Sequence, residues 1–217
     1  MPVAPGELNP FGGDLDTGRL RDLLRASADR VKCVVLTITN NAGGGQPVSV
    51  RNVKEVRQFC DAHGVPLYLD ASRFAENAYL VTEREDGYGH LSPREVARVV
   101  FELADGCWAS LKKDGMANIG GLIAFEGFPT YGGLVGRDLE VLAEGLLEVV
   151  EPDYLRYRAE CARWFGEQLS LAGPPVLQPT GCHAVYVDAG RCCCTSRRSS
   201  CPPPPSPTRS AWRAGCG

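Results

Sequence analysis

Short apolar runs and helically spaced apolar positions alternate along most of the chain. The run at 32–39, KCVVLTIT, has the length and β-branched content of a buried strand, and a turn-prone stretch follows it. Valines then recur at helical spacing between Ser49, which is suited to cap a helix, and Gly64, which is suited to end one. The next apolar run, VPLYLD at 65–70, predicts a second strand. The two strands should therefore be parallel neighbours joined by a helical crossover.

The same order of elements returns further along the chain. Ser92 is followed by Pro93 and then by Glu95, and this spacing predicts a helix start with a capping box and proline in its first turn. The sequence CWASL at 107–111 predicts a short strand that leads directly into the lysine pair Lys112–Lys113.

The C-terminal half of the pattern is mainly helical. A helical pattern covers 138–171, and Pro152 is expected to break it. The last apolar run, HAVYVDA at 183–189, predicts a final strand. Strands that alternate with helices predict an α/β fold, in which ligands gather at the carboxyl ends of the strands.

Composition narrows the class of protein. The 217 residues are 44% hydrophobic, which is enough for one well-buried core. A formal net charge of −3 argues against a nucleic-acid partner. No apolar run has the length of a membrane span, and the N-terminus lacks the basic-then-apolar pattern of a secretion signal. We therefore expect a cytoplasmic protein without membrane association.

The ten cysteines fall into two groups. Five are scattered among apolar residues and are expected to be buried, reduced thiols: Cys33, Cys60, Cys107, Cys161 and Cys182. The other five crowd the segment after Gly190, which also contains four consecutive prolines and almost no aliphatic residue. This composition predicts a partial large domain over 1–190 and a disordered tail over 191–217. We interpret the tail as an out-of-frame translation, since leucine codons CTG shifted by one base read TGC, cysteine.

Polar residues follow three of the predicted strands: Asn40 and Asn41, Asp70 with Arg73, and Ser110 with Lys112 and Lys113. Singly, each has an ordinary interpretation as a helix cap or a solvated turn, and the GGG sequence at 43–45 lacks the lysine of a phosphate-binding P-loop. Together they provide what pyridoxal phosphate requires. An amine can form an imine with the aldehyde, an acid can keep the pyridine nitrogen protonated, and donors can meet the phosphate.

Three long motifs carry a resemblance to a known family. The sequences TNNAGGGQPVSVRNVKEVRQFCDAHGVPLYLDASRFAENAYLV, ADGCWASLKKDGMANIGG and EGFPTYGGLVGRDLEVLAEGL closely resemble the tryptophanase and tyrosine phenol-lyase family of β-eliminating lyases. The resemblance covers about residues 13–190. It implies part of the large domain of a fold-type I pyridoxal phosphate enzyme, with a mainly parallel sheet and helices on both faces. It also implies a homotetramer and a bound potassium ion.

The resemblance also assigns site residues. It implies that Lys113 is the catalytic, imine-forming lysine. If the segment is extended, its two lysines point to opposite faces, so that only one meets the cofactor. The other implied cofactor contacts are Asp70 at the pyridine nitrogen, Arg73 near the phenolic oxygen, Ser110 at the phosphate, and Asn40 or Asn41 at the ring. Asn118 resembles an asparagine of the potassium-binding loop.

The implied activity is β-elimination from an aromatic amino acid. Lys113 releases the cofactor to the substrate amine and removes the α-proton, and tryptophan yields indole, pyruvate and ammonia. Tyrosine is the alternative substrate, and we favour tryptophan from the sequences EGFPTYGG and VYVDAG. The N-terminal phosphate loop, an internal strand and helix, and the C-terminal small domain of the family are not found in this sequence. A catalytically inactive fragment is therefore a second hypothesis.

Overall fold

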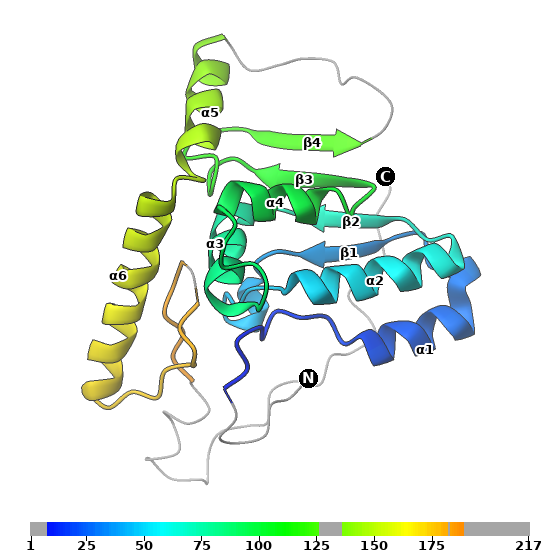
Figure 1. Cartoon of the computed structure of the whole chain (residues 1–217), viewed down its shortest axis with the longest axis horizontal. Helices are drawn as coiled ribbons and strands as arrows, with labels where there is room; N and C mark the ends of the chain where they lie inside the picture. Colours follow the sequence, from blue (N-terminus) through cyan, green and yellow to red (C-terminus); the bar gives the residue numbers. More distant parts are fainter. Residues whose placement is uncertain (1–7, 126–135, 182, 189–217) are drawn as a thin grey trace, which may run out of the picture.

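A single four-stranded sheet organises the chain in the computed structural model, which describes residues 8–125, 136–181 and 183–188. Its order is β1 (Val34–Thr37), β2 (Leu67–Asp70), β3 (Gly106–Ser110) and β4 (Gly121–Phe125) (Figure 1). The first three strands are parallel, and β4 runs antiparallel to β3. The predicted α/β class and the mainly parallel sheet are therefore confirmed.

Six α-helices accompany this sheet: α1 (Thr17–Ser27), α2 (Val50–His63), α3 (Phe74–Arg84), α4 (Pro93–Phe101), α5 (Gly136–Glu148) and α6 (Pro152–Leu171). The signals that begin and end α2 act as predicted. The Ser49 side chain accepts a hydrogen bond from the backbone N–H of Asn52, and Gly64 ends the helix at φ 64°, a left-handed conformation that glycine adopts without strain. The capping box of α4 and the helix break at Pro152 are also present.

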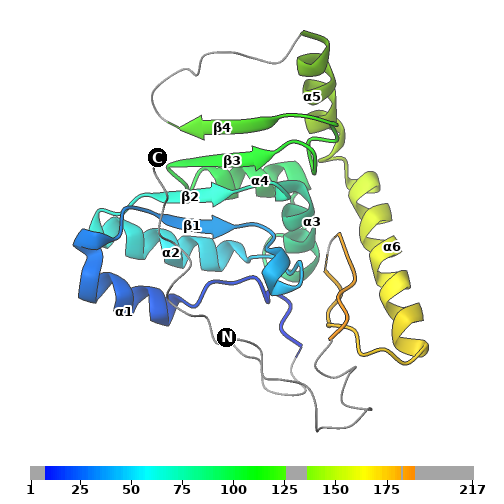
Figure 2. The same ribbon diagram turned by 180° about the vertical axis from the view of Figure 1, so that it is seen from behind.

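The two faces of the sheet differ in burial. Along β1 to β3 buried and partly exposed residues alternate, as the two-residue period of a strand requires. Helices α2 and α4 lie over one face of the sheet. In Figure 1 these helices are in front of the strands, and in Figure 2, seen from behind, the strands are in front of the helices. Beneath these helices the side chains are buried: Val34, Leu36, Leu67, Leu69 and Cys107. We call this the covered face, and we call the opposite one the open face, because Val35 there remains 41% exposed.

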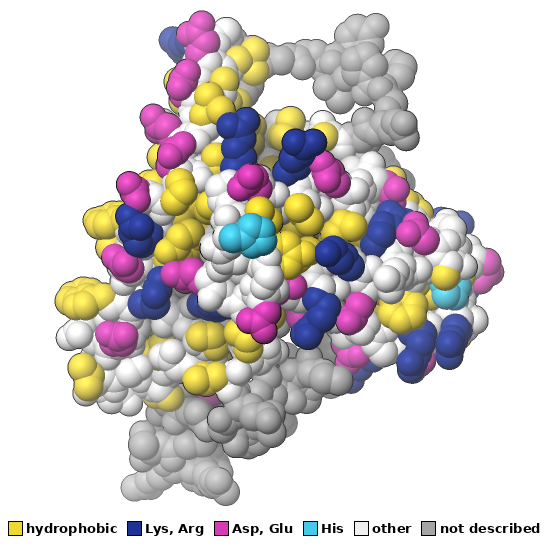
Figure 3. All heavy atoms as spheres, viewed as in Figure 1, with side chains coloured by type: hydrophobic (Ala, Val, Ile, Leu, Met, Phe, Trp, Pro, Cys, Tyr) yellow, Lys and Arg dark blue, Asp and Glu magenta, His cyan; other side chains and the backbone are white. Residues whose placement is uncertain are grey.

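The outer surface on the helix side mixes charges of both signs. Figure 3 shows lysine and arginine side chains interspersed with aspartate and glutamate over the helices. Several are paired, as between Arg98 and Glu102 on α4 and between Arg163 and Glu83. None of the described helices combines the length and the apolarity that crossing a bilayer demands.

The predicted strand at 183–189 is wrong for the described residues. Val187 forms only an isolated antiparallel bridge with Val176, supported by hydrogen bonds from Leu177 N to Tyr186 O and from Asp188 N to Pro175 O. This short pair lies outside the four-stranded sheet. Two consecutive prolines precede Val176, and because proline has no N–H, the ladder does not extend further.

The burial predicted for the cysteines is correct at two positions and wrong at two. Cys60 and Cys107 are buried free thiols, whereas Cys33 and Cys161 are exposed. Cys33 precedes the first strand residue, and Cys161 is an exposed residue of α6, so apolar neighbours in sequence did not determine burial. Cys182, the whole EGFPTYGG motif and the segment 191–217, with its predicted disorder, lie outside the described residues.

Candidate functional site at the carboxyl edge of the sheet

Parallel pairing brings the ends of β1, β2 and β3 to one edge. Thr37 is in register with Asp70, and Asp70 is in register with Trp108, two residues before the end of β3. Asp70 and Trp108 also share the open face, because residues in register on adjacent strands point to the same side. Ser110 follows on that face by the same alternation. The sheet therefore gathers three of the predicted cofactor segments at one edge.

Ser72 connects two of these segments, and the sequence-based reasoning did not identify it. Its hydroxyl donates a hydrogen bond of 2.9 Å to Asp70 Oδ1 and accepts one of 2.9 Å from the backbone N–H of Ser110. The Ser72 backbone N–H lies 3.3 Å from the same Asp70 oxygen. Ser72 is only 6% exposed, so these contacts are shielded from water. A signal was present: an aspartate that accepts a hydrogen bond from the residue two positions later is a common turn at the end of a strand.

The lysine pair lies in a turn and not in an extended segment. Lys113 N donates to Ser110 O, and Met116 N donates to Lys113 O, while Ala117 N closes the turn onto Leu111 O. Both lysines are exposed. The condition under which the two lysines would point to opposite faces, an extended segment, is therefore not met. The chain must reverse here because β4 returns antiparallel to β3.

Gly115 makes this turn sterically possible. A Cβ atom at this position would lie 2.6 Å from Leu111 O and 2.7 Å from the Leu111 Cα, closer than nonbonded atoms approach. The turn also packs against α5, where the position of a Cβ on Gly145 would be 2.3 Å from Gly115 O. Two glycines therefore allow the backbone of the lysine turn to lie tightly against its neighbours.

Asp114, the residue after Lys113, fixes the turn to the start of α3. It is 2% exposed, and its Oδ2 accepts hydrogen bonds from Ala75 N at 2.8 Å and from Glu76 N at 3.4 Å. Its own N–H donates to Ser72 O at 3.3 Å. Burial and the nearby Glu76 carboxylate raise the pKa of Asp114 to about 7, although the helix N–H groups and Arg158 act in the opposite direction. No local pattern in the sequence indicated this carboxylate's environment.

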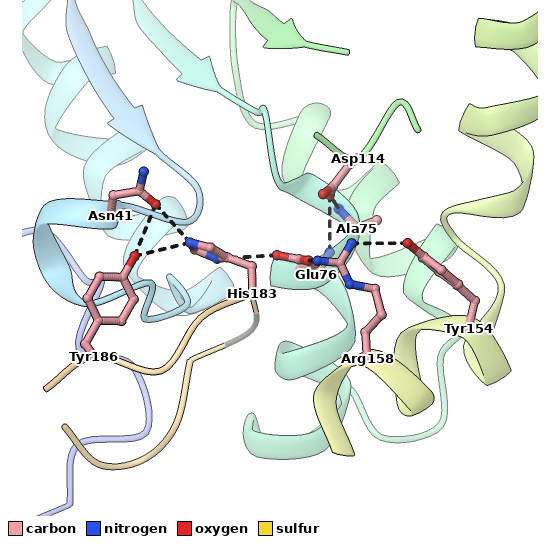
Figure 4. A network of polar contacts seen from close by, with 8 residues as sticks. All are labelled: Asn41, Ala75, Glu76, Asp114, Tyr154, Arg158, His183 and Tyr186. Atoms are coloured by element: carbon pink, nitrogen blue, oxygen red, sulfur yellow. Dashed lines mark hydrogen bonds and ion pairs between the residues drawn. The ribbon is translucent and has the colours of Figure 1, made fainter. Parts of the chain in front are cut away.

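The remaining predicted residues take different positions. Arg73 is half-buried at the N-cap of α3, immediately after Ser72. Asn40 and Asn41 are both exposed in the loop after β1, where Gly43 N and Gly45 N donate to Asn40 O. The Asn41 side chain contacts His183 and Tyr186, as Figure 4 shows.

The predicted potassium ligand has a different environment. Asn118 is exposed in the segment between β3 and β4, five residues beyond Lys113. Among the described residues, no group of three histidine, cysteine, aspartate or glutamate side chains is arranged to hold a metal ion. The role of Asn118 remains a prediction.

The fold defines an α/β protein in which the segments that carry Asp70, Arg73 and Lys113 follow the carboxyl ends of neighbouring parallel strands. The sequence model of the beta-eliminating lyase family matches residues 3–198. The chain therefore belongs to the beta-eliminating lyase family.

Named relatives agree with this membership. The chain is 51% identical over 201 residues to the tryptophanase of Salinibacter ruber, covering 85% of this chain and 43% of the relative. It is 52% identical over 198 residues to a probable tryptophanase of Aeropyrum pernix, covering 84% and 42%. The tyrosine phenol-lyase of Symbiobacterium thermophilum is 43% identical over 202 residues, covering 85% and 44%. The chain thus spans less than half the length of these curated relatives.

A solved structure gives a weaker similarity. It belongs to a protein of Exiguobacterium sp. 255-15 that is provisionally described as an aromatic amino acid beta-eliminating lyase/threonine aldolase. The TM-score is 0.49 at 23% identity, and the match covers 69% of this chain and 42% of the other.

Proposed function

We propose that the chain contributes the pyridoxal phosphate-binding edge of a lyase that eliminates the aromatic side chain of an amino acid, with tryptophan as the favoured substrate. The arrangement that carries the proposal is the link through Ser72 between the Asp70 carboxylate and the strand end before Lys113. Family membership supports the reaction class. Tyrosine stays the alternative substrate, since relatives of both names match this chain.

The donor set at this edge fits the proposed cofactor. Asp70 Oδ1 is engaged by Ser72, so its second carboxylate oxygen can face a protonated pyridine nitrogen. Lys113 is exposed on a hydrogen-bonded turn and presents a primary amine to an aldehyde. Ser110, Arg73 and the Asn41 loop add the hydroxyl, cationic and amide groups that a phosphorylated, phenolic ring would contact. When bound, pyridoxal phosphate supplies an electron-withdrawing ring that stabilises negative charge at the substrate Cα.

The chain's own residues then have defined tasks. Lys113 holds the cofactor aldehyde and, once free, accepts the proton from the substrate Cα. Asp70 keeps a proton at the pyridine nitrogen, and Ser72 orients Asp70 for that task by its two contacts with Oδ1. The Ser110 hydroxyl would contact the cofactor phosphate, while the Ser110 backbone N–H donates to the Ser72 hydroxyl.

Replacing Lys113 by alanine tests the proposal, and Lys112→Ala is the matched control on the same turn. The purified chain is incubated with pyridoxal phosphate, reduced with borohydride and digested, and the modified peptide is identified by mass spectrometry. We expect Lys113→Ala to abolish specific modification and Lys112→Ala to retain it. Both residues are exposed lysines on the same turn, so a difference between the two variants shows which position binds the aldehyde. Modification that persists in Lys113→Ala would overturn the assignment.

Product analysis separates the substrate hypotheses. Tryptophan or tyrosine is added to the cofactor-loaded chain, and pyruvate is assayed together with indole or phenol. Indole and pyruvate in equal amounts support the tryptophan reaction, whereas phenol and pyruvate support the alternative. Specific modification of Lys113 without pyruvate would identify a chain that binds the cofactor but does not carry out the elimination.

A further inference from the structure

The turn that carries Lys113 and the loop that carries Asn41 both connect to the first turn of α3. Figure 4 shows this arrangement, with Asp114 on one side of Ala75 and Glu76 and with His183 on the other. The two segments are more than 70 residues apart in sequence. Strands β1 and β3 are not paired with each other but both pair with β2, so the common attachment point on α3 adds a second link between the two segments to the one that the sheet provides.

The connection to the lysine turn is through the backbone of α3. Asp114 Oδ2 accepts from Ala75 N at 2.8 Å, which satisfies one of the N–H groups that the start of every helix leaves without an intrahelical partner. The positive end of the helix dipole favours a carboxylate at this position. Asp114 adjoins Lys113 in sequence, so a shift of this carboxylate would move the lysine backbone with it.

The connection to the Asn41 loop is through the Glu76 side chain. Glu76 is 3% exposed, and its Oε1 pairs with Arg158 Nη2 at 2.6 Å. Its Oε2 lies 3.5 Å from His183 Nδ1, a contact that is an ion pair only when the histidine ring is protonated and that is not a hydrogen bond, and His183 Nε2 lies 2.9 Å from Asn41 Oδ1. An amide oxygen can only accept, so the proton of this second contact sits on Nε2. The Tyr186 hydroxyl, 3.4 Å from the same oxygen, adds a second donor.

Helix capping alone does not account for this cluster. Asp114 would cap α3 equally well if residue 76 were apolar, yet residue 76 is a second buried carboxylate whose charge opposes ionisation of the first. Burying two carboxylates close together is costly unless both are held by partners. Arg158 on α6 and His183, which lies between the bridge residues Val176 and Val187, reach Glu76 from distant parts of the chain.

We propose that Asp114 and Glu76 are positioning residues that hold the Lys113 turn and the Asn41 loop in a fixed relation through the first turn of α3. Asp114 fixes the lysine turn, and Glu76 orients His183, which in turn fixes the Asn41 amide. The proposal rests on the function proposed above for Lys113 and the Asn41 loop. The positioning role adds two buried residues, Asp114 and Glu76, that act on Lys113 and the Asn41 loop without contacting the cofactor themselves.

The test measures both segments without any cofactor. Hydrogen–deuterium exchange, read by mass spectrometry of peptides, is compared for the full wild-type chain, Asp114→Asn and Glu76→Gln. The amides to follow are Gly43 and Gly45 in the Asn41 loop and Met116 and Ala117 in the lysine turn, all of which donate backbone hydrogen bonds. We expect each variant to raise exchange in both peptides about tenfold, because a neutral amide weakens the charge-assisted contacts that the carboxylate makes.

Asp105→Asn is the matched control. Asp105 also accepts a hydrogen bond from a backbone amide, Leu67 N at 2.7 Å, but it lies directly before β3, at the opposite edge of the sheet. This variant should leave both peptides unchanged. If Asp114→Asn affects only the lysine turn and Glu76→Gln only the Asn41 loop, each acid has a local role and the proposal is overturned. The same conclusion follows if neither variant changes exchange.

A second readout uses pyridoxal phosphate as the probe. We expect Asp114→Asn and Glu76→Gln to lower borohydride-trapped modification of Lys113 about tenfold, since a misplaced group reacts poorly, with Lys112 as the internal reference. Exchange that couples the two segments in a chain whose Lys113 is never modified would refute the proposed function alone. Normal modification of Lys113 with uncoupled exchange would refute the positioning role alone.

Discussion

The covered face and the open face of the sheet consist of alternate residues of the same strands but have different tasks. On the covered face Leu67 and Leu69 are 0% exposed beneath α2 and α4, and apolar burial determines their identity. On the open face Asp70 and Ser110 lie at the carboxyl edge and are held by Ser72. One face therefore stabilises the fold, and the other presents the candidate chemistry. The predictions below probe this difference.

The largest effect is expected on the covered face of β1. Leu36 is 3% exposed, and Leu36→Ala should lower the free energy of unfolding by about 2–5 kcal/mol, because it removes buried methyl groups and leaves a cavity. Urea titration followed by circular dichroism measures the change. Val35→Ala, one residue away on the open face, is the control and should cost clearly less, since Val35 is 41% exposed. Equal losses would show that the two faces are not distinct.

Asp114 should make the unfolding free energy depend on pH. Burial and the neighbouring Glu76 carboxylate raise its pKa to about 7 in the folded chain from the ordinary value of 3.8, so the folded state retains the proton over this window. The stabilisation from this proton is complete below the unfolded pKa and is lost as the pH rises through about 7. Between about pH 5.5 and 8 the wild type should therefore lose about 2 kcal/mol relative to Asp114→Asn.

Urea titrations of both proteins at the two pH values check this expectation. Titratable groups that do not interact with Asp114 are shared by the two proteins, so their contributions cancel in the comparison. A constant difference between wild type and Asp114→Asn would mean that Asp114 is already ionised in the folded chain at the lower pH.

The elements of the fold were predictable where local signals and burial agree. Ser49, Gly64 and the capping box from Ser92 begin or end helices through interactions within a few residues, so the sequence contains the whole signal. Helix α3 and strand β4 were not predicted. Helix α3 begins after the Asp70–Arg73 segment, and its N-cap residue makes no side-chain capping hydrogen bond. The Asp114 carboxylate, 39 residues away from Ala75, accepts the helix N–H instead.

The candidate site was predictable as a set of residues but not as an arrangement. Asp70 and Ser110 follow predicted strands, and parallel pairing brings them to one edge by topology alone. The turn at Lys113 and the connector Ser72 depend on contacts between segments far apart in sequence. The environments of Glu76 and Asp114 depend on burial by α6 and the residues before the Val176–Val187 bridge, and local pattern does not contain such information.

The smallest effect is expected at Ile123 on β4. Ile123 is 62% exposed and is in register with Trp108 on β3. Replacing it by threonine keeps a β-branched side chain that suits a strand and removes little buried apolar surface. The free energy of unfolding should change by less than about 0.5 kcal/mol in a urea titration, as for other exposed substitutions. A loss of unfolding free energy above about 2 kcal/mol would mean that the open face is covered in solution. Val35→Thr, on the opposite edge strand β1, would then show whether this cover extends across the sheet.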